Sequence, residues 1–292
     1  MRLFVVSWNM SSRMGPQNIK DLLLPESISF VPDLYAIGIQ EGPSGDINQL
    51  QIQMQATIGA SHVLLHSSTL GVLHLSLFIR RDLIWYCTTP DDAFFNNRPS
   101  AANLVKTKGA LGISFALFGT TFLFINSHLT AHQNKVKERI EEYMKISEAL
   151  NLPKNLRPLN PRYMSRDVTA RFDCVFWFGD LNFRLEISGQ EMTNIINRPT
   201  NVLNVSLDKF KETDQLTNVM SRGLAFKGFY ESSSPRFPPT YKFKYGSNDY
   251  DLVSQRVPSF TDRILYRSKQ VSHISPLLYD WVPQMDSSDH KP

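Results

Sequence analysis

Phe176-Trp177-Phe178-Gly179-Asp180-Leu181-Asn182-Phe183-Arg184 is the stretch of sequence that decides the fold. An apolar run from Cys174 to Phe178 precedes the glycine, and a short apolar run rich in aromatic residues predicts a buried strand. Gly179 would let the backbone turn and come close to a ligand. Asp180 and Asn182 follow at alternate positions, so both side chains would point into one cleft.

A carboxylate beside an amide at a strand end suits one kind of chemistry. Asp180 can take a proton from water, and Asn182 can orient that water or donate to a developing oxyanion. The alternative is an Asx turn that closes a core strand, because Gly-Asp and Asn are common turn residues. On this stretch alone the Asx turn is the simpler explanation, and the remaining segments reverse that preference.

The composition is that of a globular protein with a mild positive charge. The 292 residues can form one large domain or two small ones, and the sequence has no internal repeat. The 31 Lys and Arg against 27 Asp and Glu give a formal net charge of +4, which fits an anionic substrate or surface. Cys87 and Cys174 both lie in apolar runs, so we expect two buried free thiols in a reducing compartment.

Hydrophobic periodicity predicts strands that alternate with helices. The predicted strands are Arg2–Trp8, Asp33–Ile39, His62–His66, Val72–Arg80, Leu83–Cys87, a hairpin over Ala110–Ile125, Cys174–Phe178 and Ile264–Arg267. The predicted helices are Pro16–Leu24, Asp46–Ile58, Asn134–Leu150 and an interrupted stretch over Thr193–Met220. Thr88–Ala102 is predicted to be a polar loop. On the helix over 134–150, the charged residues, including Arg139 and Glu142, are expected to face solvent.

Polar side chains stand at the ends of several predicted strands and in nearby loops. They are Asn9, Glu41, His128, Asp180 with Asn182, Asp262, and Asp289 with His290. Strands that each deliver a polar residue at one end suggest a single shared site at a sheet edge. Carboxylate and amide oxygens suit Mg²⁺, whereas this set does not suit a structural zinc site.

The same residue types predict a reaction class. A histidine beside acids can stay protonated and donate to a phosphate oxygen. The set therefore predicts metal-assisted hydrolysis of a phosphate ester. The sequence has no Gly-rich phosphate loop followed by Lys and Ser or Thr, and no Gly-x-Ser-x-Gly elbow, so nucleotide hydrolysis and acyl transfer are disfavoured.

Eight motifs along the chain resemble those of the inositol polyphosphate 5-phosphatases, in the same order and over essentially the whole length. They are Trp8-Asn9-Met10, Gln40-Glu41, Lys108-Gly109-Ala110, Ser127-His128-Leu129, Phe176 to Arg184, Pro239-Thr240-Tyr241-Lys242, Pro258 to Arg263 and Ser288-Asp289-His290. The resemblance implies a four-layer α/β sandwich of the endonuclease/exonuclease/phosphatase (DNase I-like) superfamily. It also implies that residues 1–292 are one catalytic domain, and that the family continues with a further core strand which this chain would lack.

The resemblance assigns chemical roles to five of these residues. Asp180 would activate the attacking water, and Asn182 would orient that water or the transition state. His290 would donate to the scissile phosphate while Asp262 holds it, and His128 would contact the same phosphate.

The resemblance also assigns the metal and substrate contacts. Glu41 would bind Mg²⁺ with Asn9 nearby, and Asp289 would support the metal or the water. The residues that would bind substrate are Tyr241, Lys242 and Arg256 at the 4-phosphate, Lys108 near the 1-phosphate, and Arg263 of the Thr-Asp-Arg motif. Ser254 stands where the family often has a lysine, which weakens the expected grip on the 4-phosphate.

The expected activity is removal of the 5-phosphate from PI(4,5)P2, PI(3,4,5)P3 and PI(3,5)P2, together with soluble inositol polyphosphates. A nuclease of the same superfamily is one alternative, and an inactive lipid-binding scaffold is another. We expect phosphoinositide lipids at a membrane surface as partners, no nucleic acid, and a monomer. The resemblance implies a cytoplasmic protein at the periphery of membranes such as the Golgi or the cilium.

Overall fold

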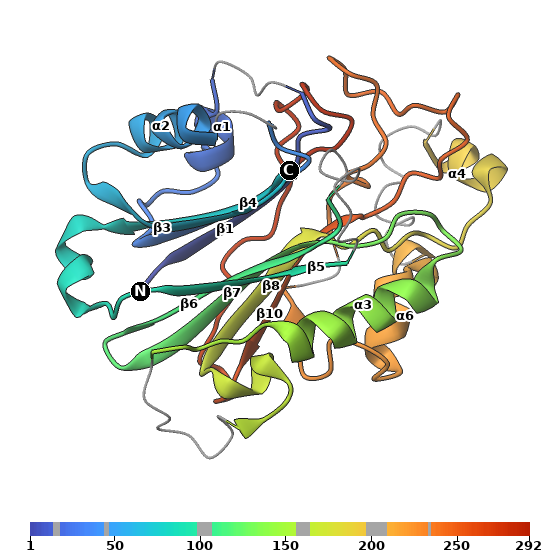
Figure 1. Cartoon of the computed structure of the whole chain (residues 1–292). Helices are drawn as coiled ribbons and strands as arrows, with labels where there is room; N and C mark the ends of the chain where they lie inside the picture. Colours follow the sequence, from blue (N-terminus) through green and yellow to red (C-terminus); the bar gives the residue numbers. More distant parts are fainter. Residues whose placement is uncertain (14–17, 44–46, 98–106, 156–163, 197–208, 233–234) are drawn as a thin grey trace.

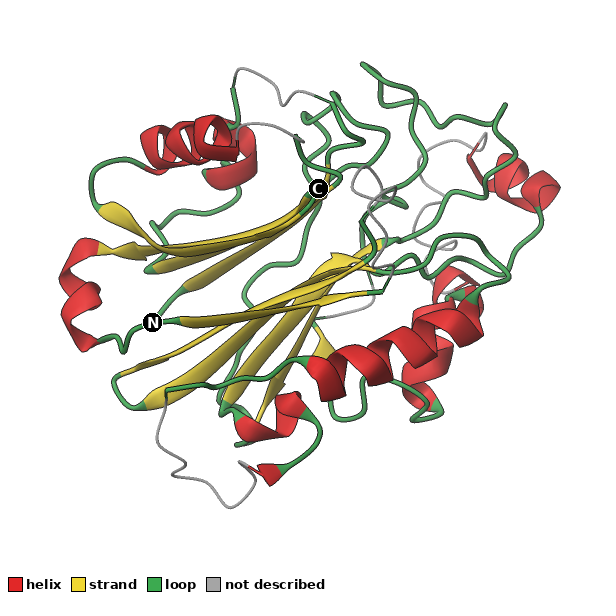
Figure 2. Cartoon of the chain, viewed as in Figure 1, coloured by secondary structure: helices red, strands yellow, loops and turns green. Residues whose placement is uncertain are grey.

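Two β-sheets lie face to face with helices on both outer sides, so that the chain forms four layers (Figure 1). The structure is a computed structural model and describes residues 1–13, 18–43, 47–97, 107–155, 164–196, 209–232 and 235–292. Figure 2 shows the helices outside the paired sheets. This arrangement confirms the α/β sandwich of the DNase I-like type that the sequence predicts.

The first sheet has four strands in the order β1-β2-β4-β3. They are β1 (Leu3–Asn9), β2 (Leu34–Gln40), β3 (His62–Leu70) and β4 (Leu73–Arg80). β1 and β2 are parallel and the other pairs are antiparallel. The helices α1 (Lys20–Leu23) and α2 (Ile47–Ile58) lie on the outer face, and β2 is apolar and buried because both of its faces are covered. Within the described residues, no strand pairs with the outer edge of β1.

The second sheet has six strands in the order β5-β6-β7-β8-β10-β9. They are β5 (Asp91–Asn96), β6 (Gly109–Leu117), β7 (Thr120–His128), β8 (Cys174–Asp180), β9 (Tyr230–Glu231) and β10 (Asp262–Ser268). The chain also contains the helices α3 (Val136–Ala149), α4 (Gly189–Ile196) and α6 (Gln215–Ser221), and the short 3-10 helices η1 (Arg81–Tyr86) and η4 (Val168–Arg171). Figure 1 shows α3 and α6 beside the outer face of this sheet.

One row of the second sheet brings polar residues together. His128 at the end of β7 pairs with Asp180 at the end of β8, and Asp180 pairs with Asp262 at the start of β10. Gly179 precedes this row with φ 134°, and a Cβ there would lie 2.0 Å from the carbonyl oxygen of Ser127. The neighbouring strand therefore requires a glycine at this position, and the expected close approach of the backbone to a ligand stays a prediction.

The two sheets are in closest contact just behind this row. A Cβ on Gly38 would lie 2.5 Å from the ring of Phe178 in the opposite sheet. Gln40 donates from Nε2 to Oδ1 of Asn126 at 2.7 Å, and Asn126 donates from Nδ2 to the carbonyl of His74 at 2.7 Å. These buried hydrogen bonds connect the two sheets, so the strand ends of one sheet have a fixed position relative to those of the other.

Three local predictions differ from the structure. The predicted strand Leu83–Cys87 is largely the 3-10 helix η1, in which Trp85 is 85% exposed. The predicted loop 88–102 contains the strand β5, which pairs with β6; residues 98–102 lie outside the described part. The predicted helix over 16–24 is described from residue 18 and is helical only over α1.

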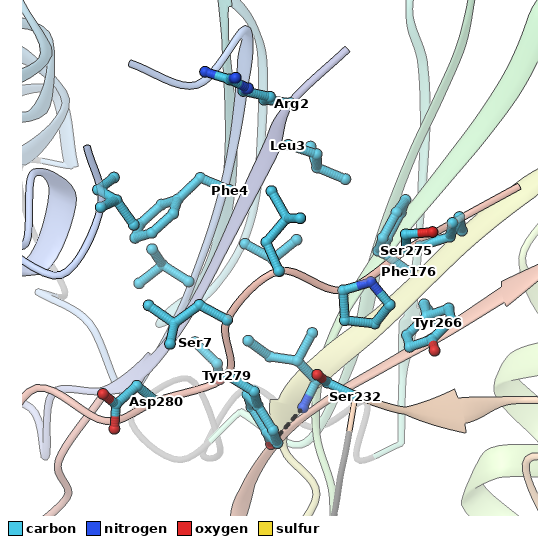
Figure 3. A pocket seen from close by; sticks show the side chains of 18 of the residues that line it. Arg2, Leu3, Phe4, Ser7, Phe176, Ser232, Tyr266, Ser275, Tyr279 and Asp280 are labelled. Carbon is cyan, nitrogen blue, oxygen red and sulfur yellow. Dashed lines mark hydrogen bonds between the residues drawn. The ribbon is translucent and has the colours of Figure 1, made fainter. Parts of the chain in front are cut away.

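A cavity of about 650 Å³ lies along β1 between the two sheets (Figure 3). Leu3 and Phe4 line it from β1, Phe176 and Tyr266 from the second sheet, and Tyr279 from the loop that follows β10. Its walls are mainly apolar side chains. In the part of the chain that is described, no helix is both long enough and apolar enough to span a bilayer.

Candidate active site

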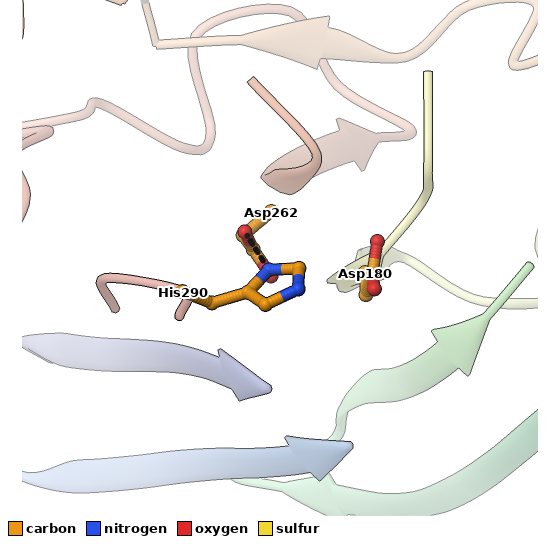
Figure 4. Close-up of side chains that lie close together, drawn as sticks. All are labelled: Asp180, Asp262 and His290. Atoms are coloured by element: carbon orange, nitrogen blue, oxygen red, sulfur yellow. Dashed lines mark hydrogen bonds and ion pairs between the residues drawn. The ribbon is translucent and has the colours of Figure 1, made fainter. Parts of the chain in front are cut away.

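The catalytic row, as we call His128, Asp180, Asp262 and His290, is a set of buried ionisable side chains. The first three lie at strand ends, and His290 lies in the C-terminal segment that follows β10. Asp180 and Asp262 are direct cross-strand partners, and like charges at such positions repel. His290 reduces that repulsion, since its Nδ1 lies 2.9 Å from Oδ2 of Asp262 and its other ring nitrogen points toward Asp180 (Figure 4). The three groups lie within 4.8 Å of one another.

The Asp262–His290 pair keeps the imidazole charged. Oδ2 of Asp262 also accepts hydrogen bonds from the hydroxyls of Thr240 and Thr261, at 2.9 and 2.8 Å. Burial alone would lower the pKa of His290, but the charge and hydrogen bond of Asp262 and the charge of Asp180 outweigh it and raise the pKa to about 9. His290 is therefore protonated at neutral pH, and its second N–H is available to a phosphate oxygen.

Asp180 is held by donors on both carboxylate oxygens. Oδ2 accepts a hydrogen bond from Nδ2 of Asn9 at 2.9 Å and lies 3.2 Å from Nε2 of His128, while Oδ1 accepts from the backbone N–H of Asn182 at 3.1 Å. Burial alone would raise the pKa of Asp180, but the hydrogen bond of His128 and the positive charges of His290 and Lys108 hold it well below its usual range. The carboxylate is deprotonated at neutral pH, which is the state that a proton acceptor requires.

Lys108 lies inside the site, against His128. Its Nζ contacts Nε2 of His128, and both side chains are buried. Burial lowers the pKa of Lys108 to about 8, against the opposing attraction of Asp180 and Glu41. Burial and the charge of Lys108 together lower the pKa of His128. The structure therefore places Lys108 beside the catalytic centre, and its expected contact with a 1-phosphate stays a prediction.

Glu41 and Asn9 offer the oxygen atoms that a hard cation needs. Glu41 directly follows β2 with φ 46°, a backbone conformation that is uncommon for non-glycine residues. Its side chain is 29% exposed, and its described charged contact is Nε2 of His128 at 3.9 Å. Oδ1 of Asn9 accepts one hydrogen bond, from the backbone N–H of Ser11, and keeps a second lone pair. These donors fit a magnesium ion.

A second set of ligand-type atoms, those of Asp180, Asp262 and His290, also lies close enough to surround an ion. A metal ligand must be deprotonated, however, and Asp262 holds His290 in its protonated form. These three side chains therefore suit proton transfer and hydrogen bonding better than metal binding.

Asp289 connects the catalytic row to the first strand. Its Oδ1 contacts the hydroxyl of Ser11, and the neighbouring Ser288 donates to the backbone carbonyl of Asn9 at 2.6 Å. Oδ2 of Asp289 lies 3.9 Å from Nζ of Lys242. Asp289, which is expected to support the metal or the water, is thus a carboxylate that its neighbours hold in place.

The recognition loop, residues 240–256, approaches the row from outside. The ring of Tyr241 packs on that of His290, with the ring centroids 4.3 Å apart. Lys242 donates from Nζ to Oδ2 of Asp251 at 2.9 Å and remains partly exposed. Arg256 is exposed, with Nη1 2.8 Å from Nδ1 of His132. The structure therefore brings Tyr241 and Lys242 to the row and leaves Arg256 at its rim.

Arg184 is a site residue for which no role was predicted from the sequence. Its guanidinium contacts Oδ1 of Asn182, and its Nε donates to the carbonyl of Asn182 at 3.2 Å. Its Cζ lies 4.6 Å from the ring centroid of Tyr241. Asn182 in turn donates from Nδ2 to the carbonyl of Leu129 at 3.0 Å, which leaves one amide hydrogen for a ligand. Its role could have been predicted from its position, because Arg184 ends the stretch Phe176–Arg184 that contains Asp180 and Asn182.

Arg263 does not contact the site, which corrects its prediction as a substrate-binding residue. The side chain is 1% exposed and extends away from the row. It donates to Asp214 at 3.0 Å and to Glu231 at 2.6 Å. A buried arginine with two acidic partners holds β10 to its neighbours, and its donors are not available to a substrate.

Comparisons with known proteins identify the family of the chain. The profile of the Endonuclease/Exonuclease/phosphatase family 2 matches residues 6–292. The phosphatidylinositol polyphosphate 5-phosphatase type IV of Rattus norvegicus is 44% identical over 295 residues, which cover 100% of this chain and 44% of the rat protein. The chain thus spans less than half the length of this mammalian relative. The sequence blocks 76–85, 107–115 and 167–169, which resemble the 72-kDa phosphoinositide 5-phosphatase, lie within the matched region.

Two further relatives are covered over most of their length. The type IV inositol polyphosphate 5-phosphatase 11 of Arabidopsis thaliana is 31% identical, with 99% of this chain and 79% of the plant protein aligned. A crystal structure of the inositol polyphosphate 5-phosphatase domain of SpSynaptojanin, in complex with inositol (1,4)-bisphosphate and calcium ion, superposes with a TM-score of 0.80 at 29% identity. That alignment covers 99% of this chain and 81% of the solved domain.

Proposed function

The chain belongs to the endonuclease/exonuclease/phosphatase family and, within it, to the inositol polyphosphate 5-phosphatases, and from this premise we propose that it removes the 5-phosphate from phosphoinositide lipids with the help of Mg²⁺. The proposed substrates are PI(4,5)P2, PI(3,4,5)P3 and PI(3,5)P2, together with soluble inositol polyphosphates. The work would be done at a membrane surface by a cytoplasmic monomer, at a location such as the Golgi or the cilium.

One observation carries the proposal: a deprotonated aspartate and a protonated histidine face each other across the end of one sheet. Asp180 accepts the proton of the attacking water, and the remaining amide hydrogen of Asn182 orients that water. His290 donates its free N–H to an oxygen of the 5-phosphate, while Asp262 keeps it charged and correctly turned. Charge that develops on the phosphate thus meets donors already in place.

Glu41 and Asn9 would hold the magnesium ion, which supplies positive charge to the phosphate oxygens when it is bound. Neither Glu41 nor Asn9 is proposed to donate a hydrogen bond to the phosphate. Their place beside His128 and Asp180 supports a cation close to the reacting group.

The recognition loop supports a headgroup that carries a second phosphate. Lys242 provides a point charge, and Arg256 provides a planar group that can bind two phosphate oxygens at once. The ring of Tyr241 lies against His290, so a headgroup held by this loop would lie beside the catalytic row. Both contacts are proposed to select lipids with a 4-phosphate.

The test is phosphate release from vesicles that contain each of the three proposed lipids. PI(4)P serves as the matched control because it has no 5-phosphate, and each assay is run with Mg²⁺ and with EDTA. We expect release from the 5-phosphorylated lipids in Mg²⁺ only. Cleavage of duplex DNA with no release from any lipid would favour the nuclease alternative. Lipid binding without release would favour the inactive scaffold.

A further inference from the structure

The turn 251–255 of the recognition loop presents two apolar side chains to solvent. Leu252 is 41% exposed and Val253 is 88% exposed. Single exposed hydrophobic residues are common on protein surfaces and carry no inference by themselves. The position of this turn, its rigid shape and its charged surroundings together distinguish it.

The turn is directly attached to the catalytic centre. Asp251, its first residue, accepts the hydrogen bond of Lys242, and its backbone N–H donates to the carbonyl of Lys242 at 2.8 Å. Lys242 lies 3.9 Å from Asp289, which precedes the catalytic His290. A surface that touches the turn is therefore only a few side chains from the row.

The shape of the turn keeps Val253 outward. Oδ1 of Asp251 accepts the backbone N–H groups of Val253 and Ser254, both at 3.1 Å, and the hydroxyl of Ser254 donates to the carbonyl of Asp251 at 3.1 Å. Gln255 then adopts φ 53°. With its backbone held in this way, the turn presents the valine in a fixed direction.

Cationic and aromatic side chains are also exposed on the loop that carries this apolar turn. Lys244 and Arg256 are exposed on the same loop, and Lys242 is partly exposed. Tyr245 is exposed as well, with the guanidinium of Arg13 3.6 Å from its ring centroid. Apolar side chains beside cations and a tyrosine are the composition of segments that sit in the headgroup layer of an anionic bilayer.

Acidic groups reduce part of that attraction. Asp249 lies 4.0 Å from Lys244, and Asp251 is paired with Lys242. Arg256 has no acidic partner among the described residues, and its described contact is a histidine. Electrostatic attraction alone would therefore be weak, and the apolar turn has to supply much of the contact with a bilayer.

The opposite end of the molecule provides a comparison with equal exposure. Val271 follows the far end of β10 and is 93% exposed, and Phe118 is exposed in the turn between β6 and β7. These residues lie at the other end of strands whose near ends carry the catalytic row. Apolar exposure is thus present at both ends, and of these two places it is the turn 251–255 that combines it with a link to the site.

We propose that Leu252 and Val253 enter the interfacial layer of a bilayer with anionic lipids and hold the catalytic row at the depth of the headgroups. This inference rests on the proposed function for its choice of partner, a lipid surface. The contact would make hydrolysis faster on a membrane than on the same headgroup free in solution, because the enzyme stays at the surface between turnovers.

The test compares Val253→Asp with the matched variant Val271→Asp, which makes the same change at an equally exposed valine at the other end. Each protein is assayed on a soluble inositol polyphosphate with a 5-phosphate and on phosphatidylserine vesicles that contain PI(4,5)P2. Binding to these vesicles is measured by sedimentation in EDTA, where no turnover is expected. Val253→Asp should reduce vesicle binding and vesicle turnover by roughly tenfold, and it should lower turnover of the soluble substrate by a clearly smaller factor, because the new carboxylate also lies on the recognition loop.

Val271→Asp should leave all three measurements unchanged. A second variant, Val253→Trp, should increase vesicle binding, because tryptophan prefers the membrane interface. Normal vesicle binding by Val253→Asp, or an equal loss on soluble and vesicle substrates, would overturn the proposal. Equal loss of vesicle binding in Val253→Asp and Val271→Asp would also overturn it.

The membrane contact and the activity can fail separately. If the wild type releases no phosphate, and Val253→Asp nevertheless binds vesicles more weakly than the wild type, the proposed function is refuted and the membrane contact is supported. If the wild type hydrolyses both substrates, and Val253→Asp binds vesicles as well as the wild type does, the proposed function is supported and the membrane contact is refuted.

Discussion

The catalytic row and the recognition loop are held by different means. His128, Asp180 and Asp262 occupy paired positions on three neighbouring strands, and their side chains are at most 3% exposed. Lys242 and Arg256 stand on a loop, partly or fully exposed, and each has one described side-chain hydrogen bond. The chemistry is thus positioned by the backbone ladder, whereas recognition depends on side chains that can change with little effect on the fold.

The largest expected effect is that of removing the proton acceptor from the row. Asp180→Asn keeps the shape of the side chain and removes its charge, so we expect turnover to fall by about 10²–10⁴-fold with little change in substrate binding. Steady-state kinetics on PI(4,5)P2 vesicles measures both quantities. A thermal unfolding curve serves as the control, and a folded variant with most of its activity would contradict the role of Asp180.

The next effect tests the charge on His290 through pH. Since the pKa of His290 is raised to about 9, activity should fall as the pH rises through that value. Asp262→Asn removes the main charge that favours the imidazolium, so the fall should move to lower pH, and turnover at neutral pH should drop by about 10²-fold or more. The measurement is the pH dependence of kcat for both proteins, and identical profiles would argue against the pair.

Linkage predicts a matching effect on stability. His290 has a raised pKa in the folded protein, so its contribution to stability is fully present below about 6.5, the ordinary value for histidine. This contribution is lost as the pH rises toward about 9. Urea unfolding at several pH values should therefore show a decline over this window in the wild type and a smaller decline in Asp262→Asn.

A smaller effect is expected at the proposed metal ligand. Glu41→Gln keeps the size of the side chain and removes a carboxylate, so the Mg²⁺ concentration for half-maximal activity should rise by about tenfold or more. The fold should be unchanged, because Glu41 lies at a strand end and is partly exposed. A Mg²⁺ titration of activity that coincides with that of the wild type would place the metal elsewhere.

The smallest effect belongs to the loop. Lys242→Ala and Arg256→Ala should lower kcat/KM on PI(4,5)P2 by about tenfold, the value of one charge-assisted hydrogen bond, and should change PI(3,5)P2 hydrolysis much less. Ser254, in place of the lysine often found in the family, is expected to soften the difference between the two lipids. Equal losses on both would mean that the two residues attract anions generally.

The strand ends could be predicted from the sequence because their signals are local. The run 174–178 is apolar, and a polar residue follows it, so Asp180 was placed correctly at a buried strand end. The pairing of Asp180 with both His128 and Asp262 depends on strand order, which is not written in any single segment. The resemblance assigned the three residues to one site in advance but gave no strand order, and local patterns alone would not have grouped them.

The wrong local predictions share one cause, namely contacts between residues that lie far apart in the sequence. Asp91 and Asp92 made the start of β5 read as a polar loop, yet Asp91 accepts the backbone N–H groups of Lys154 and Asn155 at 2.9 Å. Distant partners of this kind are invisible to a local pattern.

The helix α3 shows the same limit. Arg139 and Glu142 were expected to face solvent and are buried. Arg139 donates to the carbonyl of Thr130 at 3.0 Å, and Glu142 accepts the backbone N–H of Thr130 at 2.8 Å. Their charges hold the segment that follows β7, and periodicity cannot distinguish such residues from a solvated helix face.

The register that pairs Asp180 with Asp262 also limits how the sequence can change. Because side chains alternate along a strand, insertion or deletion of one residue within β8 or β10 would turn a carboxylate to the opposite face. Between the two strands, after β9, comes the whole recognition loop, residues 240–256, which is outside the ladder of the second sheet. It can lengthen or shorten while both carboxylates stay in place, so new substrate preferences can evolve by exchange of loops without rebuilding the chemistry.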